Sequence, residues 1–177
     1  MPAVLSIVAI AISLFIANNQ NRISLFEERY EIYQTCKTLN VNAQSANEVF
    51  LTQEIDSDAI EIWIAFVAHI IPENSILDMA VFETGSMVGE EEALEVYLQI
   101  SKDIGECCVK IESSKYVFKL SEAEECEIDT ILQEFKAITY EGLVSDPNGL
   151  GEKMIQLTQA LANISVIETM EDQLKLL

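Results

Sequence analysis

The chain has 177 residues and half of them are hydrophobic, so it can form one domain with a real core and is not generally disordered. Ten Lys and Arg oppose thirty Asp and Glu, for a net charge of −20. Residues 41–177 carry all of this excess, because the charges of residues 1–40 cancel. Such a domain repels nucleic acid, so no nucleic-acid partner is expected. The acidity fits solubility, a high-salt environment, or attraction of a basic partner or multivalent cations.

The first segment, residues 1–18, is predicted to be a transmembrane anchor. Pro2 to Ala17 contains no charged residue. Sixteen helical residues span roughly 24 Å, which is short for a hydrocarbon core of roughly 30 Å, so the bilayer would have to thin locally. Two other interpretations stay open. One is a cleaved signal peptide, although no basic residue precedes the run, and the other is a buried core helix.

Basic residues near the predicted span suggest its orientation. Arg22 and Arg29 follow the run, and no Lys or Arg precedes it. Loops rich in basic residues stay on the cytoplasmic side. We therefore expect a single-pass protein of the plasma (inner) membrane whose C-terminal domain is cytoplasmic.

Residues 19–40 are predicted to continue the anchor as an amphipathic juxtamembrane helix, because they contain neither Gly nor Pro and carry two apolar stripes at helical spacing. One stripe comprises Ile23, Phe26, Tyr30 and Tyr33; the other comprises Leu25, Ile32, Cys36 and Leu39.

Three side chains of this helix are expected to pack against the rest of the protein. Arg29 falls between the two stripes, where a cation needs a carboxylate or other acceptors from a facing helix; Glu112 is one candidate. Tyr30 and Tyr33 lie too far from the apolar run to form an interfacial aromatic belt, so they are expected to contact the soluble domain.

The remaining residues, 41–177, are predicted to form an acidic helical domain. The expected fold class is all-α, with the N-terminal helix packed with a bundle of about five helices. Ser121 and Glu124 form a capping box that begins one of these helices. The helices are expected at about 42–54, Asp58 to Ile71, 73–83, 89–119, 121–142 and 151–175. The helix at 89–119 is expected to bury a stripe that comprises Leu94, Tyr97, Leu98, Ile104, Cys108, Ile111, Lys115 and Phe118, and the helix at 121–142 one that comprises Ile128, Ile131, Leu132, Phe135 and Ile138.

Signatures of catalysis and of cofactor binding are missing from the sequence. It contains no Gly-rich phosphate loop, GxSxG, HExxH or CxxC motif. The single histidine, His69, lies in an apolar run and is expected to be a satisfied core residue. The four cysteines match neither a disulfide framework nor a zinc site, and free thiols are the simplest account. We therefore predict no catalytic residue, no cofactor and no metal site, and no enzymatic activity.

Two segments resemble a diffuse group of uncharacterised bacterial single-pass membrane proteins. The first runs from Arg22 to Tyr33 and matches their juxtamembrane pattern R-x-x-L-F-x-x-R-Y-x-x-Y. The second, Ile111 to Phe118 followed by Leu120 and Ser121, is similar to a later A-x-x-L-F region. The resemblance implies one N-terminal membrane helix that continues into a helical cytoplasmic domain, and it implies no activity.

Three functions are consistent with these features. The first is a membrane-anchored helical scaffold that binds an unknown protein partner, with lipid contacts through its N-terminal helix. The second is a structural or regulatory protein that self-associates as a homo-oligomer, because Ile23, Phe26, Tyr30 and Tyr33 have the a/d spacing of a coiled coil. Lys37 on the next a position argues against a longer repeat. The third is an acidic cation-binding domain.

Overall fold

The computed structural model describes residues 2–50, 59–71, 90–139 and 149–176, and the side chains of 12–46, 62–71, 98–139 and 149–176. Every regular element in these ranges is an α-helix, as predicted. The helices are α1 (Pro2–Phe50), α2 (Ala59–Ile70), α3 (Glu90–Val117), α4 (Glu122–Ala137), α6 (Leu150–Ala162) and α7 (Val166–Lys175). The helix expected at 73–83 lies outside the described residues.

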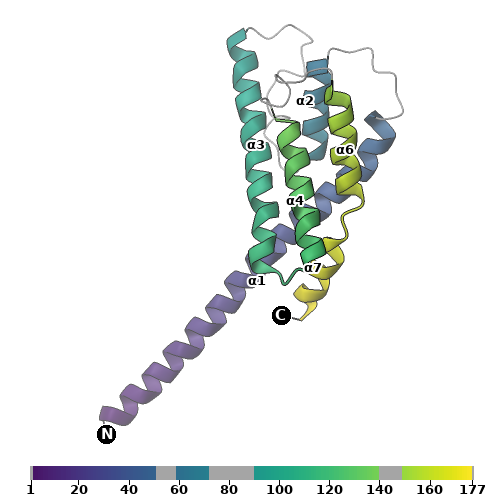
Figure 1. Ribbon diagram of the computed structural model, residues 1–177. Coiled ribbons are helices and arrows are strands. Elements are labelled where there is room, and N and C mark those ends of the chain that lie inside the picture. The colour runs from purple at the N-terminus through teal and green to yellow at the C-terminus, as the bar shows by residue number, and fades with distance from the viewer. Residues whose placement is uncertain (1, 51–58, 72–89, 140–148, 177) are drawn as a thin grey trace.

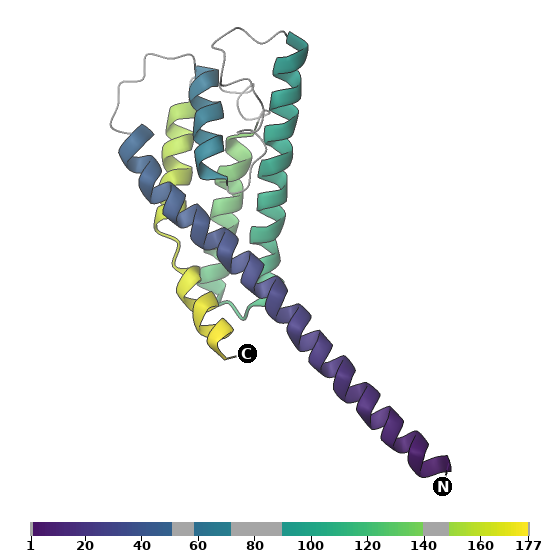
Figure 2. The ribbon, with the colours of Figure 1, turned by 180° about the vertical axis from the view of Figure 1, so that it is seen from behind.

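Helix α1 sets the shape of the molecule. It runs for 49 residues without interruption, which agrees with the absence of Gly and Pro after Pro2. The helix therefore crosses both predicted segment boundaries, at 18–19 and at 40–41, without a break. Its C-terminal half packs against α2, α3, α6 and α7, and its N-terminal half projects away from the bundle (Figure 1). The view from behind shows the same projection (Figure 2).

A single apolar core joins the helices. In α4, the predicted stripe of Ile128, Ile131, Leu132, Phe135 and Ile138 is buried, as expected. In α2, the Trp63 ring is fully buried and its Nε1 donates to the carbonyl oxygen of Ile138 at 2.7 Å. Because burying an unpaired indole N–H is costly, this bond fixes how α2 sits on the end of α4.

Helix α3 is buried along a different line from the predicted one. Leu98 was expected in its apolar stripe and is exposed. Cys107 is buried in the core, whereas Cys108 is only partly buried against it. The buried line has spacings of four and three, and comprises Ile100, Ile104, Cys107, Ile111, Ser114 and Phe118.

The prediction of one last helix over 151–175 is wrong, because the chain breaks between α6 and α7 at residues 163–165. Glu127 of α4 explains where the second helix begins. Its carboxylate accepts from the backbone N–H and the hydroxyl of Ser165, both at 2.8 Å, and from the N–H of Val166 at 3.2 Å. A carboxylate at a helix N-terminus satisfies donors that the helix itself leaves unpaired.

Two asparagines of α1 cap other helices in a similar way. Asn40 donates from Nδ2 to the carbonyl oxygens of Leu161 and Ala162, at the C-terminal end of α6, at 2.9 and 3.0 Å. Asn42 donates to the carbonyl oxygen of Ile70, the last residue of α2, at 3.1 Å. These hydrogen bonds join α1 to the C-terminal ends of α6 and α2. They satisfy carbonyl oxygens that have no partner within their own helices.

The capping box at the start of α4 is confirmed. Ser121 is the N-cap residue, its hydroxyl accepts from the N–H of Glu124, and the Glu124 carboxylate accepts from the N–H of Ser121 at 2.6 Å. The pKa of Glu124 is lowered, first by the hydrogen bond that its carboxylate accepts from the Ser121 hydroxyl and then by the one from the Thr169 hydroxyl, because both favour its charged form.

Candidate interaction surface

The projecting part of α1 exposes large apolar side chains. Ile12, Leu14, Phe15 and Ile16 are each about half to two-thirds exposed (53, 66, 67 and 48%). For these residues, the interpretation of the apolar run as a buried core helix does not hold. Within the ranges that the side-chain description covers, no helix is both long enough and apolar enough to cross a bilayer. The predicted anchor, residues 1–18, lies largely outside those ranges.

A second group of exposed apolar residues follows on the same helix, nearer to the bundle. Ile23, Phe26 and Tyr30 are 59, 40 and 49% exposed. The rings of Phe26 and Tyr30 are stacked, with centroids 6.0 Å apart. A shallow groove runs beside them and is lined by Asn19, Arg22, Ile23, Phe26 and Glu27. We call Ile23, Phe26 and Tyr30 the exposed stripe.

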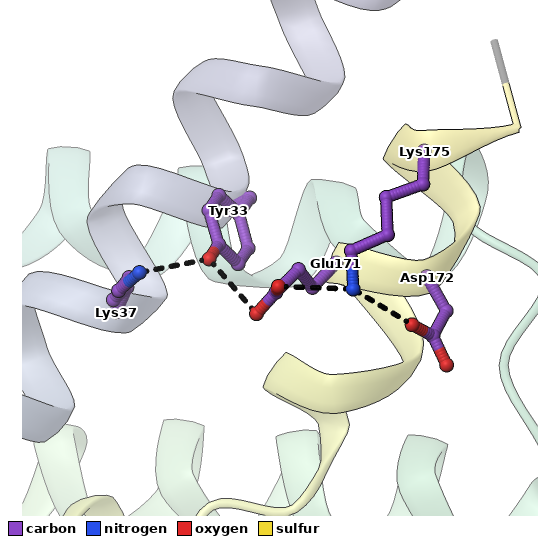
Figure 3. A network of polar contacts seen from close by, with 5 residues as sticks. All are labelled: Tyr33, Lys37, Glu171, Asp172 and Lys175. Carbon is purple, nitrogen blue, oxygen red and sulfur yellow. Dashed lines mark hydrogen bonds and ion pairs between the residues drawn. The ribbon is translucent and has the colours of Figure 1, made fainter.

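The stripe enters the bundle at Tyr33, which is buried. The Tyr33 hydroxyl accepts from Lys37 Nζ at 3.0 Å and donates to Glu171 of α7 at 3.3 Å. Lys175 joins Glu171 at 3.1 Å and Asp172 at 3.2 Å. Figure 3 shows this chain of contacts between α1 and α7. It fixes α7 at the point where α1 leaves the bundle.

The contacts of this network shift the pKa values of Glu171 and Lys37 in opposite directions. The pKa of Glu171 is lowered, first by its hydrogen bond with Lys175 and by the charge of that lysine. The pKa of Lys37 is raised, first by its hydrogen bond with Tyr33. Both shifts favour the charged forms that hold α7 against α1.

Arg29 has a different partner from the one expected. Its guanidinium lies over the ring of Phe118 at the end of α3, 5.5 Å from the ring centroid. The Nε atom is buried and has no hydrogen-bond partner among the described residues. Glu112, the one candidate partner named from the sequence, is exposed on α3. Arg29 therefore joins α1 to α3 through a cation–π contact, a type that contributes about 0.5–2 kcal/mol.

The predicted pair of tyrosines is divided between two environments. Tyr33 is buried against the helical bundle, whereas Tyr30 is half exposed and belongs to the exposed stripe. Their rings still touch, with centroids 6.4 Å apart. The boundary between covered and uncovered parts of α1 thus falls within one helical turn.

A polar cavity of about 310 Å³ lies between α1 and α3. Glu31 and Lys110 line it and form an ion pair at 2.8 Å, and Asp103, Glu106 and Cys107 also line it. Three carboxylates and one ammonium group line the cavity, so its lining keeps a net negative charge after the ion pair between Lys110 and Glu31.

The thiols and the histidine carry no reactive arrangement in the described ranges. All four cysteines are free. Burial raises the pKa of Cys36 to about 12 and that of Cys108 to about 11, which keeps both thiols protonated. His69 is half-buried, and its Nε2 lies 2.9 Å from the Ser45 hydroxyl. No group of three or more His, Cys, Asp or Glu in this part of the chain could hold a metal ion.

Comparison of the chain with protein-family models, with curated proteins and with solved structures gave no match in any of the three.

Proposed function

We propose that the protein is a membrane-anchored helical interaction module. Residues 1–18 would insert in the bilayer, the bundle would stand on its cytoplasmic side, and the exposed stripe would meet a protein partner just outside the lipid. The observation that carries this proposal is the exposure of Ile12, Leu14, Phe15 and Ile16 on a helix that has left the bundle.

The energetics favour lipid over water for this segment. Exposed apolar surface costs about 25 cal/mol per Å² relative to an apolar environment, and large contiguous apolar patches on soluble proteins mark interaction sites. The sequence adds that no charged residue occurs from Pro2 to Ala17. A bilayer accepts a helix with these properties, because the helix satisfies its own backbone hydrogen bonds.

The position of the basic residues supports a cytoplasmic bundle. Arg22 and Arg29 lie on the bundle side of the uncharged run, and the free thiols agree with a reducing compartment. Protease added outside intact cells should leave the bundle uncut, and its digestion there would reverse the orientation.

Vesicle flotation of the full chain tests the anchor. Ile7→Asp with Ile10→Asp places two carboxylates near the middle of the uncharged run, where each costs about 3 kcal/mol. We expect the unaltered chain to float with the vesicles and this variant to remain at the bottom. Val109→Asp with Tyr116→Asp, at two exposed apolar residues of α3, is the matched control and should float. Flotation of the first variant, or no flotation of the unaltered chain, would contradict the anchor.

A further inference from the structure

The exposed stripe belongs to a longer heptad pattern. With Ile23 counted as an a position, every a and d position from residue 5 to residue 30 is apolar except residue 19. The a positions are Ala9, Ile16, Ile23 and Tyr30, and the d positions are Leu5, Ile12, Asn19 and Phe26. The register ends at Tyr33, which α7 covers. Residues 5–17 are apolar at every position except Ser6 and Ser13 and therefore fit any register. The heptad seam is defined by Ile23, Phe26 and Tyr30, with Asn19 as its one polar core residue.

The groove beside the stripe has the composition of a coiled-coil hole. In a parallel two-stranded coiled coil, a side chain at an a position of one helix enters a hole made by four residues of the facing helix. For Ile23 these are the preceding d and g residues, Asn19 and Arg22, with the a and d residues, Ile23 and Phe26. All four line the groove.

Two charged residues beside the groove would attract their counterparts on a second copy of the chain only if the two helices were parallel. Arg22 occupies a g position, and Glu27 occupies the e position of the following heptad. In a parallel pair, the g position of each helix faces the e position of the other helix, so this contact forms twice. Antiparallel helices would instead pair g with g and e with e, so that like charges would meet.

We infer that the groove on α1 binds a second copy of the chain, and that the two α1 helices pair in parallel along a seam from Ile12 to Tyr30. This inference rests on the proposed function, since it names the partner of the same surface. Two chains anchored with the same orientation are already parallel. Asn19 at its d position fixes the register, because an offset would bury its amide against an apolar residue.

The charge of the bundles limits how far the pairing extends. Each bundle carries the excess negative charge of residues 41–177, and like charges repel over a Debye length of about 8 Å at physiological ionic strength. The seam therefore ends where α7 covers Tyr33 and the two bundles diverge.

Disulfide trapping of the full chain in vesicles tests the pairing. On a background that carries Cys126→Ser, which removes the exposed thiol, Ile16→Cys and Tyr30→Cys should each form covalent dimers under mild oxidation. Leu14→Cys and Glu28→Cys, at f positions on the outer face, are the controls and should remain monomeric. Trapping only in a mixture of the Ile16→Cys and Tyr30→Cys chains would indicate antiparallel helices and overturn the inference, as would equal trapping at the controls.

A charge exchange tests the specific contact. Arg22→Glu and Glu27→Arg should each weaken dimerisation about tenfold, since two attractive pairs become repulsive. The double variant should restore it. Additive losses in the double variant would contradict an ion pair between the two chains.

Flotation and disulfide trapping together distinguish loss of helix pairing from loss of the membrane anchor. A chain that floats with vesicles and gives no trapped dimer retains the anchor and overturns the pairing. A chain that remains in solution and is trapped at Ile16→Cys and Tyr30→Cys retains the pairing and overturns the anchor.

Discussion

The two halves of α1 carry the same kind of apolar stripe but have different surroundings. In the bundle half, Ile32, Cys36 and Leu39 are buried against other helices. In the projecting half, Ile12 and Ile23 are exposed. Helical spacing of apolar residues thus identifies an apolar face, but it does not say whether other helices of the chain bury that face.

Polar residues distinguish the halves more clearly than apolar ones. Asn40 and Asn42 of the bundle half cap two neighbouring helices, and the small Ala43 is buried in the core. The projecting half carries Arg22 and Glu27 beside its groove. Those residues suit a partner that enters with complementary charge.

The largest difference is expected from matched deletions of apolar side chains. Leu39→Ala should lower the free energy of unfolding of the bundle by about 2–5 kcal/mol, because it leaves a cavity in a buried site. Ile23→Ala should change it by less than about 0.5 kcal/mol. Denaturant unfolding followed by Trp63 fluorescence measures both. Equal losses would mean that the projecting half is part of the folded core.

A smaller difference is expected from the asparagines. Asn40→Ala removes the donor for the carbonyl oxygens of Leu161 and Ala162 and should cost about 1–2 kcal/mol of bundle stability. Asn18→Ala, on the exposed part of α1, should have almost no effect. The same unfolding measurement applies, and an equal change in the two variants would remove the capping role of Asn40.

The smallest effect is expected at the boundary between the halves. The folded-state pKa of Glu171 lies below its ordinary value of 4.5, so its contribution is present above that pH and is lost as the pH falls through the folded pKa. Glu171→Gln should therefore be slightly destabilising at pH 7 and neutral below the folded pKa. Unfolding curves of both proteins across pH 2–8 measure this. A pH-independent difference would mean that the charge of Glu171 does not contribute.

Local signals predicted the fold best. The capping box of Ser121 and Glu124 involves residues three positions apart, and the stripe of α4 depends on one helix alone, so both could be identified from the sequence. The break before α7 could not, because Glu127, which caps it, lies 38 residues from Ser165. The same holds for Asn40, whose acceptors at the end of α6 are more than 100 residues away.

The candidate surface was predictable only in part. The spacing of Ile23, Phe26 and Tyr30 identified an apolar stripe, but covering of Tyr33 by α7 depends on tertiary packing. Arg29 was expected to contact a carboxylate or other acceptors of a facing helix, and its guanidinium lies instead over the ring of Phe118. The contact between Arg29 and Phe118 could not be predicted, because the two residues are far apart in the sequence and no local spacing relates them.

A scan of nitroxide labels along α1 of the vesicle-bound chain tests the central claim that one helix serves three environments. On the Cys126→Ser background, labels at Leu14, Ile23 and Thr38 report the apolar segment, the seam and the bundle, where Thr38 is half-buried beside the polar cavity. We expect contact with dissolved oxygen in the lipid at Leu14, spectral broadening by the label of a second chain at Ile23, and reduced access of oxygen without such broadening at Thr38. Free access of a water-soluble relaxant to Leu14, together with no broadening at Ile23, would contradict this claim.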